Sequence, residues 1–150
     1  MAIIVGAALF EYGTQTTVIT DTGSIAVDAF NSGTTTALVQ TDYAPLGDAV
    51  LEVEFAVAPS AGGAIHLYRR DMNISGTSDS TIPDANFKNT YIGSFPVDLV
   101  TTAQYISLTD IPLTIDQEFY LENGTNQATD AAGGIDTVLK ITPKTYNAKT

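Results

Sequence analysis

The strongest constraint on the fold is a two-residue alternation of apolar and polar side chains, which recurs along the chain where a helical period is hardly seen. It is clearest in residues 49–57, where Leu51, Val53 and Phe55 alternate with glutamates. Successive side chains of a strand point to opposite faces, whereas a helix would scatter these residues around its axis. The pattern therefore predicts a half-buried strand, with Val57 on the same buried face.

A turn and a returning strand are expected next. Residues 58–63 (Ala-Pro-Ser-Ala-Gly-Gly) combine proline, which donates no backbone hydrogen bond, with glycine, which tolerates a positive φ. Residues 64–70 alternate again, and we expect them to pair with 49–57 as a hairpin whose inner face carries Ile65 and Leu67. The outer face of this strand would hold His66, Tyr68 and Arg70, across from the glutamates of the first strand.

Seven more segments, rich in β-branched residues and separated by Gly, Pro, Asn and Asp, are expected to be strands. They are 16–20, 24–30, 34–40, 91–95, 104–108, 118–121 and 137–142. Short strands with turn signals every ~8–12 residues predict an all-β fold. We therefore expect a β-sandwich, in the jelly-roll form, with two long polar loops at 71–90 and 123–136.

At 150 residues the chain is expected to hold one sandwich domain, over residues 15–143. An extended N-terminal arm would precede it at 1–14, and a C-terminal tail at 144–150 is expected to fray. The arm is apolar, has no Lys or Arg, and reaches only about half the length of a membrane span, so neither a signal peptide nor an anchor is expected. The glycosylation sequons at Asn73 and Asn123 are accordingly interpreted as chance matches.

Composition narrows the classes of function. Seventeen acidic residues against six basic ones give a formal net charge of −11 at pH 7. Nucleic acid and anionic lipid are bound through clustered Lys and Arg, so neither is expected as a partner. The chain has no Cys and no Trp, and His66 is its single histidine. Disulfides are excluded and most nucleophilic chemistry lacks its usual residues, so the chain is interpreted as a non-enzymatic protein that binds or builds.

One segment resembles the start of a calcium-binding loop. Asp71, Asn73 and Ser75 place oxygen atoms at alternate positions, and Gly76 allows the sharp turn that such loops need. The twelfth position is Ile82, where a calcium loop carries a bidentate Glu, and no flanking helices are expected. The alternative is that these side chains cap turns by bonding their own backbone. No metal or cofactor is assigned, and calcium binding stays an open question here.

Carboxylate pairs do not single out a catalytic site. Glu52 and Glu54 would be close enough for glycoside hydrolysis, but so would any such pair on a strand. Glu118 and Glu122 would lie about 13 Å apart along one strand, which is too far. Both pairs are interpreted as parts of a solvated sheet face, and His66 as an outward strand residue. No catalytic residue is predicted.

Five strings in the chain carry a resemblance to a known family. They are Leu-Glu-Val-Glu-Phe at 51–55, Leu-Tyr-Arg-Arg at 67–70, Tyr-Ile-Gly-Ser-Phe-Pro at 91–96, Gln-Tyr at 104–105 and Phe-Tyr-Leu-Glu-Asn at 119–123. In this order the chain resembles the small virion structural proteins of tailed bacteriophages, of the jelly-roll head decoration or cement type. The resemblance spans residues 50–142, and 1–49 add nothing to it. It implies a protein without catalytic residues that binds assembled capsid shells and stiffens them.

The resemblance also implies partners and a location. The partners would be the major capsid protein and neighbouring copies of the chain, which is expected as a homotrimer on the capsid surface of the virion, after synthesis in the host cytoplasm. An apolar arm that adds as a strand to a neighbour would give affinity through main-chain bonds. The residues expected to touch partners are Ile3, Ile4, Val5, Leu9, Phe10, Asp71, Asn73 and Phe87.

An alternative function is a carbohydrate-binding β-sandwich module on a phage surface or tail. It would need tyrosines such as Tyr68, Tyr91 and Tyr105 gathered on one exposed face, with calcium near Asp71. A small hydrolase with paired carboxylates is a third class, for which the sequence offers no specific support.

Overall fold

The computed structural model describes residues 9–72, 79–88, 90–130 and 133–147. These residues form ten strands and no helix, which confirms the all-β class. The first five strands are β1 (Leu9–Tyr12), β2 (Thr16–Asp21), β3 (Thr34–Thr35), β4 (Leu38–Val39) and β5 (Leu46–Val53). The others are β6 (Ala64–Asp71), β7 (Tyr91–Pro96), β8 (Gln104–Pro112), β9 (Asp116–Asn123) and β10 (Thr137–Asn147). Among the described residues, no helix is long and apolar enough to cross a membrane.

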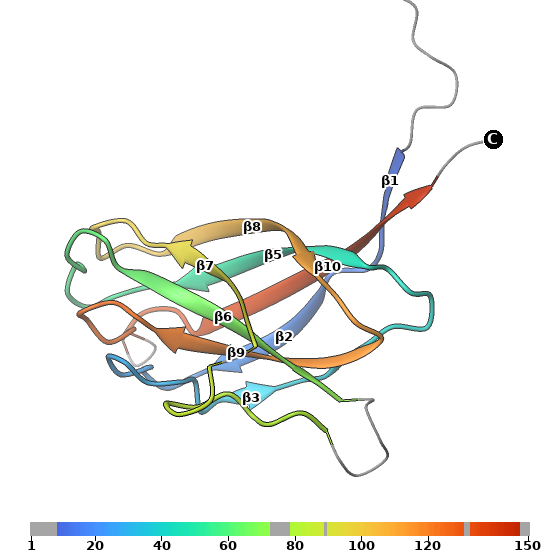
Figure 1. Cartoon of the computed structure of the whole chain (residues 1–150). Helices are drawn as coiled ribbons and strands as arrows, with labels where there is room; N and C mark the ends of the chain where they lie inside the picture. Colours follow the sequence, from blue (N-terminus) through green and yellow to red (C-terminus); the bar gives the residue numbers. More distant parts are fainter. Residues whose placement is uncertain (1–8, 73–78, 89, 131–132, 148–150) are drawn as a thin grey trace, which may run out of the picture.

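The strands form two antiparallel sheets that lie face to face (Figure 1). The first sheet has the order β3-β2-β10-β5-β8, with β1 paired to the end of β10, and the second sheet has the order β4-β9-β6-β7. The runs β2-β10-β5-β8 and β4-β9-β6-β7 are the strand order of a jelly roll, in which two Greek keys wrap around one core. The predicted β-sandwich is therefore confirmed.

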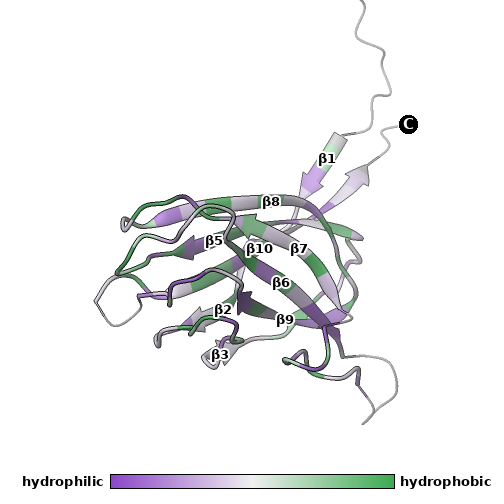
Figure 2. Cartoon of the chain, turned by 60° about the vertical axis from the view of Figure 1, so that its left-hand side comes forward, coloured by the Kyte–Doolittle hydropathy of each residue, from purple (hydrophilic) through white to green (hydrophobic). Residues whose placement is uncertain are grey.

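The core lies between the sheets and is filled by alternate residues of both, as the colouring of the strands by hydropathy illustrates (Figure 2). Leu51, Val53 and Phe55 are fully buried, as the alternation predicts, although β5 itself ends at Val53. The second sheet faces them with Ile65, Leu67, Phe95, Phe119 and Leu121. Fully burying one such side chain contributes about 1.5–3 kcal/mol, so this inner layer supplies most of the driving force for folding.

The predicted hairpin over residues 49–70 is wrong. β5 pairs with β8 and β10 in the first sheet, whereas β6 pairs with β7 and β9 in the second. Residues 54–63 carry the chain from one sheet to the other, and Val57, which was expected inside, is exposed in this crossover. Alternation reveals which face of a strand is buried, but strands of both sheets bury the same kind of face. Glu52 and Glu54 consequently do not face His66 or Arg70.

The segment 24–30 also differs from its prediction, because it forms no regular strand. Asp28 has a φ of 57°, a left-handed conformation that interrupts an extended chain. The backbone nevertheless pairs with β9: Asp28 N–H donates to the carbonyl of Asn123, and Asn123 N–H donates to that of Ala29. The segment thus covers part of the β9 edge that short β4 leaves open. The predicted strand at 34–40 is likewise divided into β3 and β4, which belong to different sheets.

The ends of the sandwich differ from the predicted boundaries at 14 and 143. β10 runs on to Asn147, so residues 144–147 are part of a strand and not of a fraying tail. Pro143 lies inside β10, although the predicted strand stopped at residue 142. Its carbonyl accepts from Gly13 N–H at 2.8 Å, between the pairing partners β1 and β2. The N–H and C=O of an extended residue point to the same side, so the missing donor of Pro143 falls in this gap.

Candidate functional site

The two chain ends form a two-stranded ribbon, residues 9–12 and 144–147, that stands out from the sandwich in both views (Figures 1 and 2). β5 follows β10 only as far as the pair of Leu46 with Lys144, and β2 starts opposite Ile141. Within the described residues, the last three positions of β10 therefore pair with β1 alone. A two-stranded sheet without further strands is marginally stable in water, so this ribbon is suited to receive additional contacts.

One face of the ribbon is aromatic. The register places Phe10 opposite Tyr146 and Tyr12 opposite Lys144, so these four side chains share a face. The rings of Phe10 and Tyr146 lie 4.3 Å apart between centroids. Phe10, Tyr12 and Tyr146 are 42%, 61% and 58% exposed. Clustered exposed aromatic rings are typical of an interaction surface, because they bury much apolar area at a contact.

Lys144 fixes the root of the ribbon to the outer face of the first sheet. Its Nζ lies 2.5 Å from Oδ1 of Asp48 and 2.8 Å from Oδ1 of Asp110, and 5.2 Å from the centroid of Phe10. Asp110 has a φ of 59° and lies at a register shift between β5 and β8. Hydrogen bonds to Asp110 and Asp48 raise the pKa of Lys144 well above its usual value, against burial, which lowers it. The ribbon is thus anchored by a buried lysine that pairs with two more exposed carboxylates.

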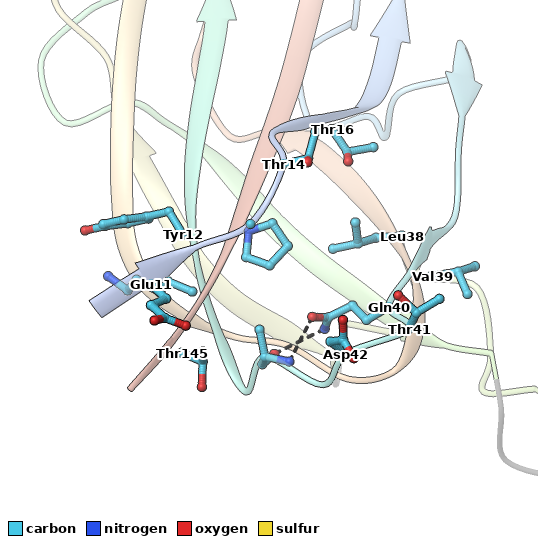
Figure 3. A pocket seen from close by; sticks show the side chains of 14 residues that line it. Glu11, Tyr12, Thr14, Thr16, Leu38, Val39, Gln40, Thr41, Asp42 and Thr145 are labelled. Carbon is cyan, nitrogen blue, oxygen red and sulfur yellow. Dashed lines mark hydrogen bonds between the residues drawn. The ribbon is translucent and has the colours of Figure 1, made fainter. Parts of the chain in front are cut away.

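A cleft of about 440 Å³ lies between the ribbon root and residues 38–44 (Figure 3). It is lined by Glu11 and Thr145, which the register places on the ribbon face opposite to Phe10. Gln40 holds the opposite wall in place: its amide donates to the carbonyls of Ala44 and Thr114 at 3.1 and 2.7 Å, and accepts from Ala44 N–H. The cleft is open and largely polar, and it separates the ribbon from the second sheet.

A second polar cluster lies on the outer face of the second sheet. There the registers of β7, β6 and β9 align side chains in rows. The first row is Ser94, His66 and Glu122, and the second is Tyr91, Tyr68 and Tyr120. Side chains opposite one another on the same face of neighbouring strands lie within contact range. His66 and Glu122, treated as unrelated by the sequence interpretation, are therefore direct neighbours.

Segments outside the sheet turn this face into a bowl. Lys88, from the loop before β7, reaches across to pair with Glu122, and the ring of Phe30 covers Tyr68 at 5.2 Å between centroids. Tyr68 is consequently buried, although it lies on the outer face as predicted. We call the cavity of about 330 Å³ that results the bowl. Its lining is Asp28, His66, Tyr68, Lys88, Tyr91, Glu122 and Gly124.

Glu122 is the charged centre of the bowl and is only 3% exposed. Its Oε2 accepts from the Tyr68 hydroxyl at 2.7 Å, and its Oε1 accepts from Lys88 Nζ. Burial by itself raises the pKa of Glu122, but the hydrogen bonds from Lys88 and Tyr68 outweigh it and hold the pKa below its usual value. Burial, and then the bond to Glu122, raise the pKa of Tyr68. The bowl therefore holds an ionised carboxylate beside a neutral phenol.

A hydrogen-bonded chain forms the other wall. The Tyr91 hydroxyl and Ser94 Oγ are 2.7 Å apart, and Ser94 Oγ is 2.8 Å from His66 Nδ1. A Cβ atom at Gly124 would lie 2.3 Å from His66 Nε2, so only glycine leaves room for the imidazole here. His66 is thus held in the bowl wall by the bond at Nδ1, with the backbone of Gly124 beside its other side.

Two of the residues that the sequence predicted as partner contacts, Leu9 and Phe10, lie in the ribbon, where the backbone of Leu9 pairs with that of Asn147. Ile3, Ile4, Val5 and Asn73 lie outside the described residues. Phe87 is half-exposed beside Lys88, whereas the Asp71 carboxylate is bound internally, 3.0 Å from both Arg69 Nε and Thr114 Oγ1. Sequence reasoning missed Tyr12, Tyr146 and Lys144, because the pairing of β1 with β10 that brings them together leaves no local pattern.

Two further candidate sites came from the sequence, the calcium-like segment and a cluster of exposed tyrosines. Ser75 and Gly76 of the calcium-like segment lie outside the described residues, and the part of the chain that is described holds no group of three or more acidic, His or Cys residues fit for a metal. Tyr68 is buried, while Tyr91 and Tyr105 are 53% and 65% exposed on different sheets. These three tyrosines therefore do not form one exposed cluster.

Replacing Tyr68 with Phe is expected to lower the free energy of unfolding by about 1–2 kcal/mol at pH 7, because Glu122 loses a donor to its charged form. A carboxylate whose pKa is lowered on folding stabilises the fold above its unfolded pKa of about 4.3, and this contribution disappears as pH falls through the folded value. The difference from wild type should therefore shrink at pH 3. Urea denaturation measures it, with Tyr120→Phe as the comparison: Tyr120 is half-buried, and its hydroxyl bonds Glu118, which is more exposed than Glu122. Equal losses in both variants would contradict the prediction.

Comparisons with protein-family models, with curated proteins and with solved structures found no match. What the chain does must therefore be argued from the ribbon, the bowl and the sequence features above.

Proposed function

We propose that the chain is a non-enzymatic structural protein of a phage virion, which assembles as a homotrimer and binds the capsid shell to stabilise it. The observation that carries the proposal is the projecting ribbon, because it combines strand edges that have no paired strand among the described residues with exposed aromatic side chains at one end of the molecule. Its role is to dock onto a neighbouring copy or onto the shell.

The geometry of the ribbon supports assembly in two ways. Beyond Lys144 the outer edges of both strands lack a neighbour among the described residues, and such edges accept a further strand through main-chain hydrogen bonds. The face with Phe10, Tyr12 and Tyr146 supplies apolar area next to those edges. Many copies on one shell add up weak contacts of this kind, because each bound copy raises the effective concentration of the next contact.

The charges favour controlled assembly. All five bases in the described part of the chain are paired with carboxylates of the same molecule, as Arg69–Asp71, Arg70–Glu118, Lys88–Glu122, Lys140–Glu52 and Lys144–Asp48. The surplus acids behind the net charge of −11 include exposed ones such as Asp42, Asp84 and Asp98, whereas Asp21 is buried. Like charge keeps copies apart except where a specific contact outweighs it, which limits association to defined sites.

The virion location rests on the resemblance of residues 50–142 to phage decoration proteins. Four of its five strings lie within β6, β7, β8 and β9, and the fifth, at 51–55, begins in β5 and runs two residues past its end. The carboxylates weighed as catalytic are engaged structurally: Glu52 pairs with Lys140, and Glu118 lies 3.1 Å from Arg70 Nη1. Glu122 is the exception: it is 3% exposed, so the predicted solvated sheet face is wrong for this residue.

The experiment has two parts. Light scattering of the purified chain at several concentrations gives its mass, and a trimer is expected. Cosedimentation with purified empty shells of tailed phages then tests capsid binding, and saturable binding at symmetric sites is expected. A chain that stays monomeric and sediments with none of the shells would overturn the proposal.

The double substitution Phe10→Ser and Tyr146→Ser is expected to turn the oligomer into monomers and to weaken self-association by at least about tenfold. The substitutions remove the paired rings from the ribbon without touching the sandwich core. Tyr105→Ser is the matched control, since it removes an equally exposed tyrosine from β8. Light scattering reads out the mass, and unchanged mass in the double variant would show that the ribbon is not the interface.

A further inference from the structure

We propose that the bowl on the second sheet is a binding site for a neutral saccharide ring, with Tyr91 as the stacking platform and Lys88, Glu122 and Asp28 as the polar partners. The bowl lies on the second sheet and the ribbon extends from the first, so this site does not depend on assembly. The two proposals can therefore fail separately.

The bowl has the shape and size of a small-ligand site. Its volume of about 330 Å³ falls at the lower end of the range of ligand pockets, which suits a single ring better than an extended chain. It is preformed, because its wall is held by the bonds from Tyr91 through Ser94 to His66 and its floor by the pair of Tyr68 with Glu122. A preformed site loses little conformational entropy on binding.

Tyr91 provides an apolar surface at the rim. Its ring is held edge-on by Tyr68 and His66, at 5.7 and 6.1 Å between centroids, yet the residue is 53% exposed. These contacts orient the ring, and the exposed part of Tyr91 is accessible from the cavity that it lines. The C–H face of a sugar ring is apolar and flat, and stacking on an aromatic ring buries it.

The polar groups offer both donors and acceptors. Lys88 Nζ carries three N–H groups and uses one on Glu122, and its side chain is 46% exposed. Each Glu122 oxygen accepts one bond from the protein and has capacity for a second. Asp28 adds further acceptor oxygens to the lining. Sugar hydroxyls both donate and accept, so they match such a mixed set.

Charge selects a neutral ligand. Lys88 is already paired with Glu122, and Asp28 leaves the lining with one negative charge in excess. A phosphate or another anion would be repelled by the two carboxylates. A neutral, hydroxylated ring meets no such penalty.

The single histidine of the chain makes the test specific. His66 lies in the bowl wall, so its imidazole proton signals in an NMR spectrum need no assignment and report on this site. The full chain is titrated at fixed pH with methyl glycosides of glucose, galactose and mannose, with N-acetylglucosamine, and with inorganic phosphate as the anionic probe. We expect a saturable shift of the His66 signal with at least one sugar and none with phosphate.

Variants complete the test. Tyr91→Ala is expected to weaken sugar binding by about tenfold, whereas Tyr105→Ala, which removes an exposed tyrosine from the other sheet, leaves it unchanged. Lys88→Gln, at a half-exposed position, serves as a second variant should Tyr91→Ala fold poorly, and it should also weaken binding. The ribbon double variant should bind sugar like wild type. The proposal is overturned if no sugar gives a saturable shift, if phosphate binds instead, or if Tyr105→Ala weakens binding as much as Tyr91→Ala.

Discussion

Replacing Asn123 with Ala is expected to lower the free energy of unfolding by about 3 kcal/mol, because one fully buried side chain makes four hydrogen bonds. Its Nδ2 donates to the carbonyls of Ile25 and Gln127, at 2.9 and 2.8 Å. Its Oδ1 accepts from the N–H and the hydroxyl of Thr125, at 3.0 and 2.7 Å. Without it, the N–H of Thr125 loses its partner in a buried position, which is costly for any polar group.

The position of Asn123 explains why the effect should extend beyond stability. It lies at the end of β9 and ties two loops to that strand, the segment with Asp28 and the loop with Gly124. Both residues line the bowl, so the substitution should also disturb the His66 signal. Both Nδ2 protons of Asn123 are used in hydrogen bonds and the side chain is fully buried. The sequon at 123–125 is therefore inaccessible to glycosylation in the folded chain.

Urea denaturation at pH 7 and fixed protein concentration measures the change, since association would otherwise contribute to the apparent stability. A loss of about 3 kcal/mol corresponds to a fall in Tm of roughly 6–12 °C for a chain of this length. Asn126→Ala is the control: Asn126 is exposed and makes one bond, to Ser60 N–H. Its loss should stay within about 0.5 kcal/mol. An Asn123 variant no less stable than the Asn126 variant would refute the role given to this side chain.

Replacing Lys144 with Met is the second substitution with a large expected effect, a loss of about 2–3 kcal/mol at pH 7. Removing one partner of a buried ion pair costs about 3–5 kcal/mol, but Asp110 is 61% exposed and recovers part of its hydration. Met keeps most of the volume, so the loss reports on charge and not on a cavity. Asp48 is left without its cation beside β10.

The pH dependence of this variant has a definite sign. Folding raises the pKa of Lys144, so its contribution is complete below the unfolded pKa of about 10.4 and is lost as pH rises through the folded value. The difference in unfolding free energy between wild type and Lys144→Met should be constant from pH 7 to 9 and decrease above pH 10. Lys140 lies on the same strand as Lys144, but its pair with Glu52 is more exposed. Lys140→Met should therefore lower the free energy of unfolding by no more than about 1 kcal/mol. A pH-independent difference, or equal losses in the two variants, would contradict the assignment.

Particular residues show what local patterns predict well. The alternation of Leu51, Val53 and Phe55 predicts a strand with one buried face, and all three are fully buried. This prediction works because successive side chains of a strand point to opposite faces. A half-buried strand therefore has apolar and polar residues in alternation. Pro143 shows the limit of local patterns. Its missing N–H is tolerated because the residue faces the gap between β1 and β2, and the sequence around it does not reveal that gap.

The bowl could not be predicted from the sequence either, because it too depends on which parts of the chain become neighbours. Its lining comes from four separate stretches of chain, around residues 28, 66–68, 88–91 and 122–124. His66 and Glu122 are 56 positions apart and become neighbours only because β6 and β9 pair in one register. A shift of that register by one residue would turn one of them to the core. No local pattern records it.

The sequence by itself determined the class of this protein: an all-β sandwich, its buried faces, its strong acidity and the absence of Cys-based chemistry. Only the tertiary structure decided which strands are neighbours, that the chain ends pair as a projecting ribbon, and that His66, Lys88 and Glu122 meet in one bowl. The physical reason is that burial is set residue by residue through hydrophobicity, whereas strand pairing is set by the packing of the whole chain around one core.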